Sequence, residues 1–182
     1  MSYREEQGIH GRLQWVPLTS IAPPLRHAVI VAEDTHFYEH NGTDWDAMWE
    51  AMKKNIRRRQ LYAGGSTLSQ QLVKNLYLNP SKTFWRKLEE MVITFRLEQE
   101  LSKSRILEIY LNVAEWGQGI YGAEAAAQHY FDKPASDLTL EEASWLAAIL
   151  PSPLRYEKHR HSRYIDAKAQ RIGRWIEKRF GD

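Results

Sequence analysis

Apolar residues recur every three or four positions along most of this chain, which is the spacing of one face of a helix. Ser20 and the Pro23-Pro24 pair begin a predicted helix that continues through Ala32, because proline is tolerated in the first helical turn. A second stripe has helical spacing and fits either a core helix or an exposed flap; its members are Trp45, Met48, Trp49 and Met52. Strand-like alternation is scarce, so we predict a mainly α fold.

Capping signals mark where the later helices begin. Thr67 with Gln70, and Thr139 with Glu142, have the spacing of a capping box, in which side chain and backbone satisfy each other's hydrogen bonds. Ser102 can cap a further helix. We also expect a flexible glycine-rich turn over 117–122.

Two long amphipathic helices are predicted, at about 84–101 and 164–180. Candidate core positions of the first are Leu88, Met91, Val92, Phe95 and Leu97. The second keeps Ile165, Ile172, Trp175 and Ile176 on one side. Gly181 is expected to end the second helix.

Composition is that of an ordinary globular protein and narrows the function classes. The chain has 182 residues, of which 43% are hydrophobic and 26% charged, with a net charge of +2. Such a small net charge gives no bulk reason to expect nucleic-acid binding. The absence of cysteine excludes disulfides, thiolate metal sites and a cysteine nucleophile.

No apolar run approaches the roughly 20 residues that span a bilayer. The polar start of the chain shows no signal peptide. We therefore expect the chain as written to be soluble.

Glu33 is the most informative candidate for chemistry. It follows the apolar run Ala28–Ala32 and precedes Asp34, His36 and His40. Burial beside an apolar segment disfavours the charged carboxylate and raises its pKa, which suits proton transfer near neutral pH. The two histidines have i,i+4 spacing, but no H-E-x-x-H motif is present. We predict structural hydrogen bonding by His40 and no metal ligands.

A small-residue turn, 64–67, leads into a predicted helix whose free N–H groups could hold an anion. Four cations follow within about two helices, and together they could neutralise a diphosphate: Lys74, Lys82, Arg86 and Lys87. The spacing of a nucleotide-binding P-loop is absent.

Glu90 can share a helical face with Arg86 and Lys87. The residues alone allow two interpretations. One is an intrahelical salt bridge at the surface, and the other is a second functional carboxylate among cations.

Several segments occur in a characteristic order: EDTHFYEHNG, GGSTLSQQLVKNLYL, RKLEE, KSRILEIYLN and the long segment from GIYGAEAAAQHYF to SPLRY. In this order they resemble the motifs of peptidoglycan glycosyltransferases, and the monofunctional biosynthetic transglycosylases most of all. The resemblance covers residues 12–180. It implies a single domain over 1–182, with a lysozyme-like helical lobe and a smaller mobile, membrane-facing flap at about 41–65.

The resemblance also implies inverting transfer that polymerises lipid II and releases undecaprenyl diphosphate. Glu33 would be the general base and Glu90 the second carboxylate, near the diphosphate. No cofactor would be obligatory, although Mg²⁺ or Mn²⁺ could join the diphosphate. Substrate would also be bound by a larger set taken over from the motifs: Asp34, His40, Ser66, Thr67, Gln70, Gln71, Lys74, Lys82, Arg86 and Lys87.

The partners implied are lipid II, the growing lipid-linked glycan, the membrane surface, moenomycin-type inhibitors and cell-wall synthesis proteins, without nucleic acid. The place of action would be the periplasm or the outer face of the bacterial cytoplasmic membrane. The anchor expected of the subtype is missing from this sequence, which leaves membrane contact to the flap.

Two alternatives stay open. A lysozyme-like hydrolase would also use paired acids, but it would not need cations around the second one. A non-enzymatic binder of acidic surfaces would use the basic run 53–59 and the C-terminal helix, with binding that weakens in salt.

Overall fold

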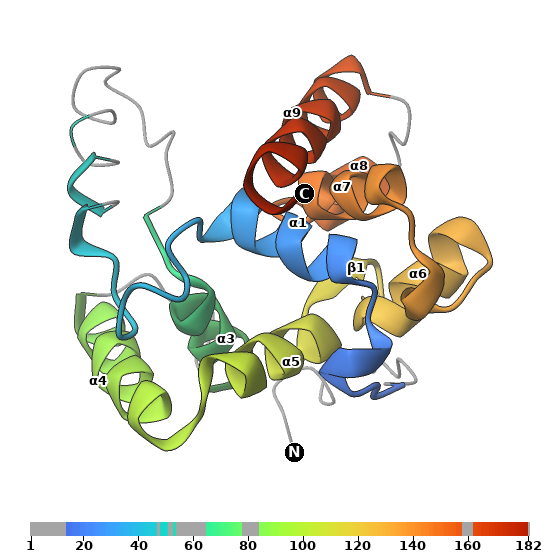
Figure 1. Cartoon of the computed structure of the whole chain (residues 1–182). Helices are drawn as coiled ribbons and strands as arrows, with labels where there is room; N and C mark the ends of the chain where they lie inside the picture. The colour runs from blue at the N-terminus through green and yellow to red at the C-terminus, as the bar shows by residue number, and fades with distance from the viewer. Residues whose placement is uncertain are drawn as a thin grey trace. The chain divides into compact units, whose positions relative to one another are not determined.

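The computed structural model describes residues 14–46, 48–50, 53, 65–77, 84–157 and 162–181. The elements, in chain order, are η2 (Leu18–Ser20), α1 (Pro23–Glu33), α3 (Leu68–Tyr77), α4 (Phe84–Glu100), α5 (Lys103–Val113), β1 (Glu115–Gly117), β2 (Ile120–Tyr121), α6 (Ala123–Phe131), η3 (Ala135–Asp137), α7 (Leu140–Ile149), α8 (Pro153–Glu157) and α9 (Arg163–Phe180). The fold is mainly α, as predicted (Figure 1). No helix within these ranges is long and apolar enough to cross a membrane.

Contacts divide the chain into two compact units. Unit 1 combines Met1–Ala32 with Leu107–Asp182, and unit 2 is Glu33–Ile106. The single domain and its flap stay predictions, and most of the flap lies outside the described residues.

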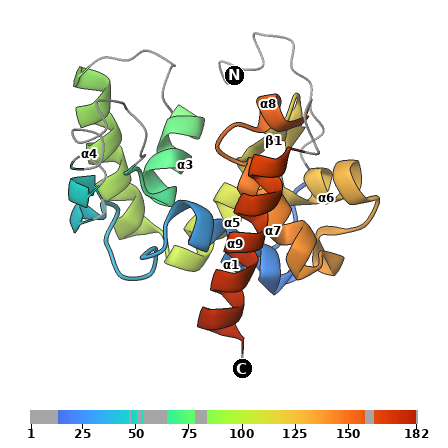
Figure 2. The ribbon, with the colours of Figure 1, turned by 90° about the horizontal axis from the view of Figure 1, so that it is seen from above.

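Unit 1 is organised around α7 and α9, which lie side by side (Figures 1 and 2). Thr139 and Glu142 form the predicted capping box at the start of α7. Ile165, Ile172 and Ile176 of α9 are buried, as predicted, and Gly181 caps the helix. Trp175, expected on the same side as these isoleucines, is half-exposed.

The turn expected over 117–122 is present and lies within a short antiparallel hairpin. β1 pairs with β2, and Gly119 and Gly122 have φ values of 74° and 89°. Glycine adopts this left-handed backbone without strain. The flexibility of this turn stays a prediction.

Unit 2 is built on α3 and α4, which pack against each other (Figure 2). Its buried apolar residues include Phe37 of the loop after α1 and Leu68, Leu72 and Val73 of α3. Gly42 of the same loop has a φ of 92°, and a Cβ there would lie 3.1 Å from Thr94 Cγ2. The loop can therefore approach α4 closely only with glycine at this position.

The orientation of α4 is the reverse of the prediction. Its buried side is polar and consists of Glu90, Thr94 and Glu98 at i, i+4 and i+8. Its apolar stripe faces outward: Trp85 is 76% exposed, and Leu88, Val92 and Phe95 are each about half-exposed. The assignment of Leu88, Val92 and Phe95 to the core was wrong, because the carboxylates on the other side of the helix have partners inside unit 2 and are the buried ones.

Candidate active site

Glu33 is the last residue of α1 and is half-buried. Gln71 of α3 donates a 2.9 Å hydrogen bond from Nε2 to Glu33 Oε2. Gln71 lies one turn into α3, so the start of this helix fixes one oxygen of the predicted base. This partner is a neutral amide, which orients the carboxylate.

Asp34 ties the loop after α1 to the beginning of α3. Its two carboxylate oxygens lie 3.0 Å from His40 Nε2, and Oδ2 also accepts a 2.9 Å hydrogen bond from the Leu68 backbone N–H. A carboxylate at a helix N-terminus is stabilised by the free N–H groups and by the helix dipole. The predicted hydrogen-bonding role of His40 is confirmed.

The predicted capping box of α3 is present. The Thr67 N–H donates to Gln70 Oε1 and the Gln70 N–H to Thr67 Oγ1, both at 3.2 Å. The Thr67 hydroxyl donates to the Gly42 carbonyl at 2.6 Å, and Gln70 Nε2 donates to Thr43 Oγ1 at 3.2 Å. These side chains are buried and bind the protein itself, so substrate binding by Thr67 and Gln70 stays a prediction.

Two other predicted binding residues are accessible in unit 2. Ser66 precedes α3, Lys74 lies on its second turn, and both are exposed. Lys82 lies outside the described residues. Substrate contacts of Ser66, Lys74 and Lys82 stay predictions.

Glu90 of α4 is surrounded by cations although it is only 3% exposed. Lys87 Nζ forms an ion pair with its Oε1, and Arg86 Nη1 lies 3.5 Å from Oε2. The Lys87 side chain is much more exposed than that of Glu90, so one face of this ammonium can meet an incoming anion. The salt bridge that the spacing allows does form.

The two predicted catalytic carboxylates both have side-chain partners within unit 2. An amide contacts Glu33, whereas an ammonium and a guanidinium contact Glu90. The cations beside Glu90 are groups that could also meet an anionic part of a substrate.

Sequence reasoning missed Glu98. Glu98 accepts a hydrogen bond from Ser69 Oγ and pairs with Lys103 Nζ at 2.8 Å. The i, i+4, i+8 series from Glu90 could have found Glu98, had the polar side of the helix been taken as the buried one.

The described residues contain no group of three or more His, Cys, Asp and Glu side chains that could hold a metal ion. His36 Nδ1 lies 2.9 Å from Asp44 Oδ2, and His40 contacts Asp34. Each histidine thus has a carboxylate partner of its own.

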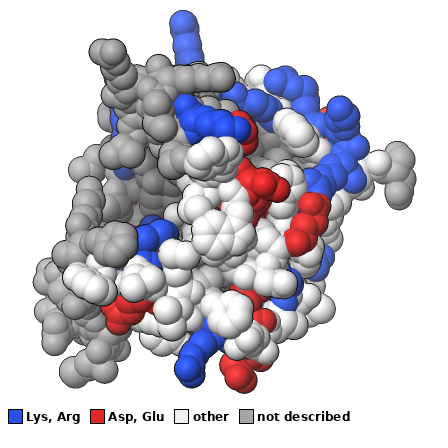
Figure 3. Space-filling view, turned by 90° about the vertical axis from the view of Figure 1, so that its left-hand side faces the viewer, with Lys and Arg blue, Asp and Glu red and all other residues white. Residues whose placement is uncertain are grey.

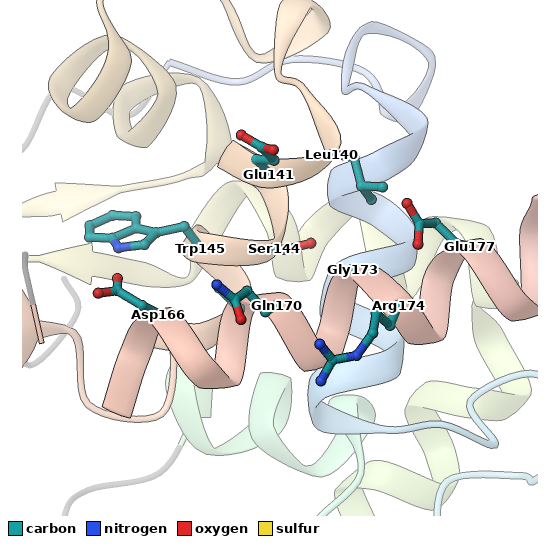
Figure 4. Close-up of a pocket in the computed structure, with 10 residues that line it drawn as sticks. Leu140, Glu141, Ser144, Trp145, Asp166, Gln170, Gly173, Arg174 and Glu177 are labelled. Carbon is teal, nitrogen blue, oxygen red and sulfur yellow. The ribbon is translucent and has the colours of Figure 1, made fainter. Parts of the chain in front are cut away.

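A pocket of about 490 Å³ lies within unit 1, between α7 and α9. Figure 4 shows Trp145 and Glu141 of α7 on one side and Asp166, Gln170, Arg174 and Glu177 of α9 on the other. Three carboxylates and one guanidinium give this lining a negative balance, which disfavours a diphosphate. The candidate active site is therefore the carboxylate and cation set of unit 2.

Comparison with known proteins agrees with this geometry. A family model described as Transglycosylase matches residues 4–177. A relative from Nitrosomonas eutropha is 54% identical over 87% of this chain and 65% of its own length. Relatives from Methylobacillus flagellatus and Nitrosospira multiformis are 53% and 50% identical, over 69% and 70% of their own lengths. This chain thus spans about two thirds of the length of these relatives.

All three relatives are named biosynthetic peptidoglycan transglycosylase. Their similarity covers most of this chain and supports glycosyl transfer over hydrolysis. The chain belongs to the transglycosylase family, as the order of its motifs implied.

Proposed function

We propose that this protein is a peptidoglycan glycosyltransferase that polymerises lipid II into glycan strands by inverting transfer. The observation that carries the proposal is the pair of carboxylates in unit 2, where Gln71 orients Glu33 and where Glu90 holds Arg86 and Lys87. Family membership supports the same reaction class.

In the proposed reaction Glu33 takes the proton from the 4-hydroxyl of the acceptor lipid II. The acceptor oxygen forms a bond to the anomeric carbon of the donor glycan as the bond from that carbon to the diphosphate oxygen breaks. The electron pair leaves with undecaprenyl diphosphate, and Glu33 returns its proton to water. Gln71 supports this role because its hydrogen bond fixes the orientation of the carboxylate.

The leaving diphosphate gains negative charge, so cations held at its position stabilise the transition state. Arg86 and Lys87 are held in place by the buried Glu90, and Lys74 adds an exposed ammonium on α3. Glu90 then acts by fixing two cations near the leaving group. Lys82 would extend the same cluster.

A divalent cation at the diphosphate is a separate proposal. Both oxygens of Glu90 have cationic partners, and the described residues form no metal cluster. The protein side of the site therefore does not fit a resident metal. Mg²⁺ or Mn²⁺ would be held chiefly by phosphate oxygens, and no step above depends on it.

The partners in this proposal are lipid II, the growing glycan, the membrane surface and moenomycin-type inhibitors, with action in the periplasm or on the outer face of the cytoplasmic membrane. Among the described residues, most of the exposed large apolar side chains belong to unit 2, for example Trp45, Trp49, Trp85, Val92 and Phe95. Such a surface suits an interface with lipid. On the face drawn in Figure 3, acidic and basic side chains are interspersed, whereas a nucleic-acid site would favour one sign of charge.

A paired assay with lipid II and finished glycan tests the function. We expect the protein to lengthen strands from lipid II in detergent and to release no fragments from finished glycan. Release of short fragments without strand growth would show that the protein is a hydrolase. An unchanged yield with Glu33→Gln would support the non-enzymatic alternative.

A further inference from the structure

The pocket between α7 and α9 belongs to unit 1, whereas the candidate active site belongs to unit 2, and no step of the proposed reaction uses the pocket. Its volume of about 490 Å³ is within the range of sites that bind small molecules. The lining includes three carboxylates, those of Glu141, Asp166 and Glu177, and one guanidinium, that of Arg174. This charge balance favours a cationic ligand.

Ser144 of α7 lines the pocket with a buried hydroxyl group that has no hydrogen-bond partner. The residue is only 2% exposed, and no donor or acceptor in the described part of the chain meets its Oγ. A buried hydroxyl without a partner is unfavourable, and such groups are rare in native proteins. Figure 4 shows the Ser144 oxygen directed toward Gly173 of α9.

Gly173 leaves the space over this hydroxyl open. It lies within α9, where glycine is less favourable than alanine. A Cβ at Gly173 would lie 3.5 Å from Ser144 Oγ, which is ordinary van der Waals contact, and no other atom of α7 lies within 4 Å of that position. The packing of α7 on α9 therefore does not require glycine here. Two locally unfavourable residues that meet at one pocket are typical of a functional site.

The Trp145 ring gives the pocket an aromatic surface that is held in place. Tyr130 and Phe131 of α6 contact this ring, with ring centres 5.1 and 5.9 Å away. Figure 4 shows Asp166 of α9 at the same end of the pocket. Asp166 has no ion-pair partner in the part of the chain that the structure describes. Both an indole face and a carboxylate attract an ammonium group, so this end of the pocket suits an amine.

The part of the pocket over Gly173 has acidic groups of its own. Glu177 follows Gly173 by four positions on α9, so the two share a helix face. Glu141 precedes Ser144 by three positions on α7 and shares a face with it in the same way. Asp166 and Gly173 are at i and i+7 of α9, about 10 Å apart along the helix axis. The carboxylates are thus spread along the pocket, and the described residues group no three of them around a metal ion.

We propose that this pocket binds a linear polyamine, whose ammonium groups are spaced along an apolar chain as the carboxylates are spaced along the pocket. One ammonium lies between Asp166 and the face of the Trp145 ring. Another lies over Gly173, where it donates to Ser144 Oγ and faces the carboxylates of that part. The site is separate from the proposed transfer reaction and does not depend on it.

Arg174 opposes such a ligand, because it is the one cation among the described lining residues. Figure 4 shows its guanidinium directed away from Ser144. Arg174→Gln removes the like-charge repulsion and should therefore tighten polyamine binding.

Isothermal titration calorimetry of the full chain with spermidine tests the proposal, and butylamine, which carries a single ammonium, is the matched probe. Ser144→Ala removes the hydroxyl, and Gly173→Ala fills the space over it. Neither change should lower the melting temperature, because one removes an unpaired buried hydroxyl and the other replaces a glycine within a helix. Asp166→Asn tests the acidic end at an exposed position. Glu89→Gln, exposed on α4 of unit 2, controls for the change in net charge.

Wild type and Glu89→Gln should bind spermidine saturably, and butylamine should bind at least about 10-fold more weakly. Ser144→Ala and Gly173→Ala should each weaken spermidine binding by about 10-fold or more. Asp166→Asn should weaken it by about 3-fold, and Arg174→Gln should strengthen it by about 3-fold, because these charges are exposed.

The proposal is overturned if wild type shows no saturable binding of spermidine, or if both alanine variants bind it as wild type does. It is also overturned if Glu89→Gln weakens binding as much as Asp166→Asn, since the attraction would then be a property of the net charge. A lower melting temperature for Ser144→Ala would show that the hydroxyl has a structural partner and would contradict its role in binding.

Discussion

Gln71 Nε2 donates a 2.9 Å hydrogen bond to Oε2 of Glu33. This contact connects the end of α1 to the first turns of α3. It gives the proposed base a fixed orientation, and it makes the start of α3 part of the active site.

Replacing Gln71 by Leu should therefore reduce catalysis more than binding. We expect kcat for lipid II polymerisation to fall by about 10-fold or more, since a base that turns freely loses its aligned geometry. KM should change much less. Gln170→Leu is the matched control, because Gln170 is exposed on α9. A normal kcat for Gln71→Leu would contradict a positioning role.

Replacing Glu90 by Gln should lower the stability of the protein. The change leaves Arg86 and Lys87 beside a neutral amide in a buried position. We expect the free energy of unfolding to fall by about 1–3 kcal/mol, less than for a fully buried pair because Lys87 is partly exposed. Chemical denaturation measures this value. Glu89→Gln is the control, since the neighbouring Glu89 is exposed. An equal fall in the free energy of unfolding for Glu89→Gln would contradict a stabilising role of the Glu90 ion pairs.

The two capping boxes allow a comparison between helices. Thr67→Ala and Thr139→Ala each remove a cap and should each cost about 1 kcal/mol in the free energy of unfolding. Thr67 also holds the Gly42 carbonyl, so only Thr67→Ala should lower polymerisation at a temperature where both variants are folded. Equal activities would show that the start of α3 does not set the site geometry.

His27 should make the stability of the protein depend on pH. Burial, and then the nearby Arg26 charge, lower its pKa below the ordinary 6.5, and its ring stacks on Phe180 at 3.9 Å. The unfolded chain takes up a proton near pH 6.5 that the folded protein resists, so stability falls as the pH falls from 6.5 through the folded pKa.

His27→Phe keeps the stacking and removes this titration. Melting temperatures between pH 7 and pH 5 should therefore fall less for His27→Phe than for wild type. His129→Gln serves as the control, because His129 is exposed. An equal fall in melting temperature between pH 7 and pH 5 for His27→Phe and for wild type would contradict the prediction.

The sequence predicted what depends on local signals. Capping boxes at Thr67 and Thr139, the proline-led start of α1 and the stop at Gly181 all depend on neighbouring residues, and the structure has each of them. The ordered motifs predicted the family, which the comparisons confirm.

The orientation of α4 could not be predicted in the same way. Periodicity shows that a helix has two faces, but the tertiary partners decide which face is buried. Glu90 and Glu98 are inside because Arg86, Lys87, Lys103 and Ser69 satisfy their oxygens, and Glu98 and Ser69 are far apart in the sequence. The contact of Gln71 with Glu33 is non-local in the same sense.

The most direct test of the central claim is lipid II polymerisation by wild type, Glu33→Gln and Glu89→Gln, with binding of a moenomycin-type inhibitor measured on the same preparations. If Glu33 is the base, Glu33→Gln binds the inhibitor as wild type does but forms no glycan strands, whereas Glu89→Gln forms them normally. Strand formation by Glu33→Gln at the wild-type rate would contradict the assignment of the base.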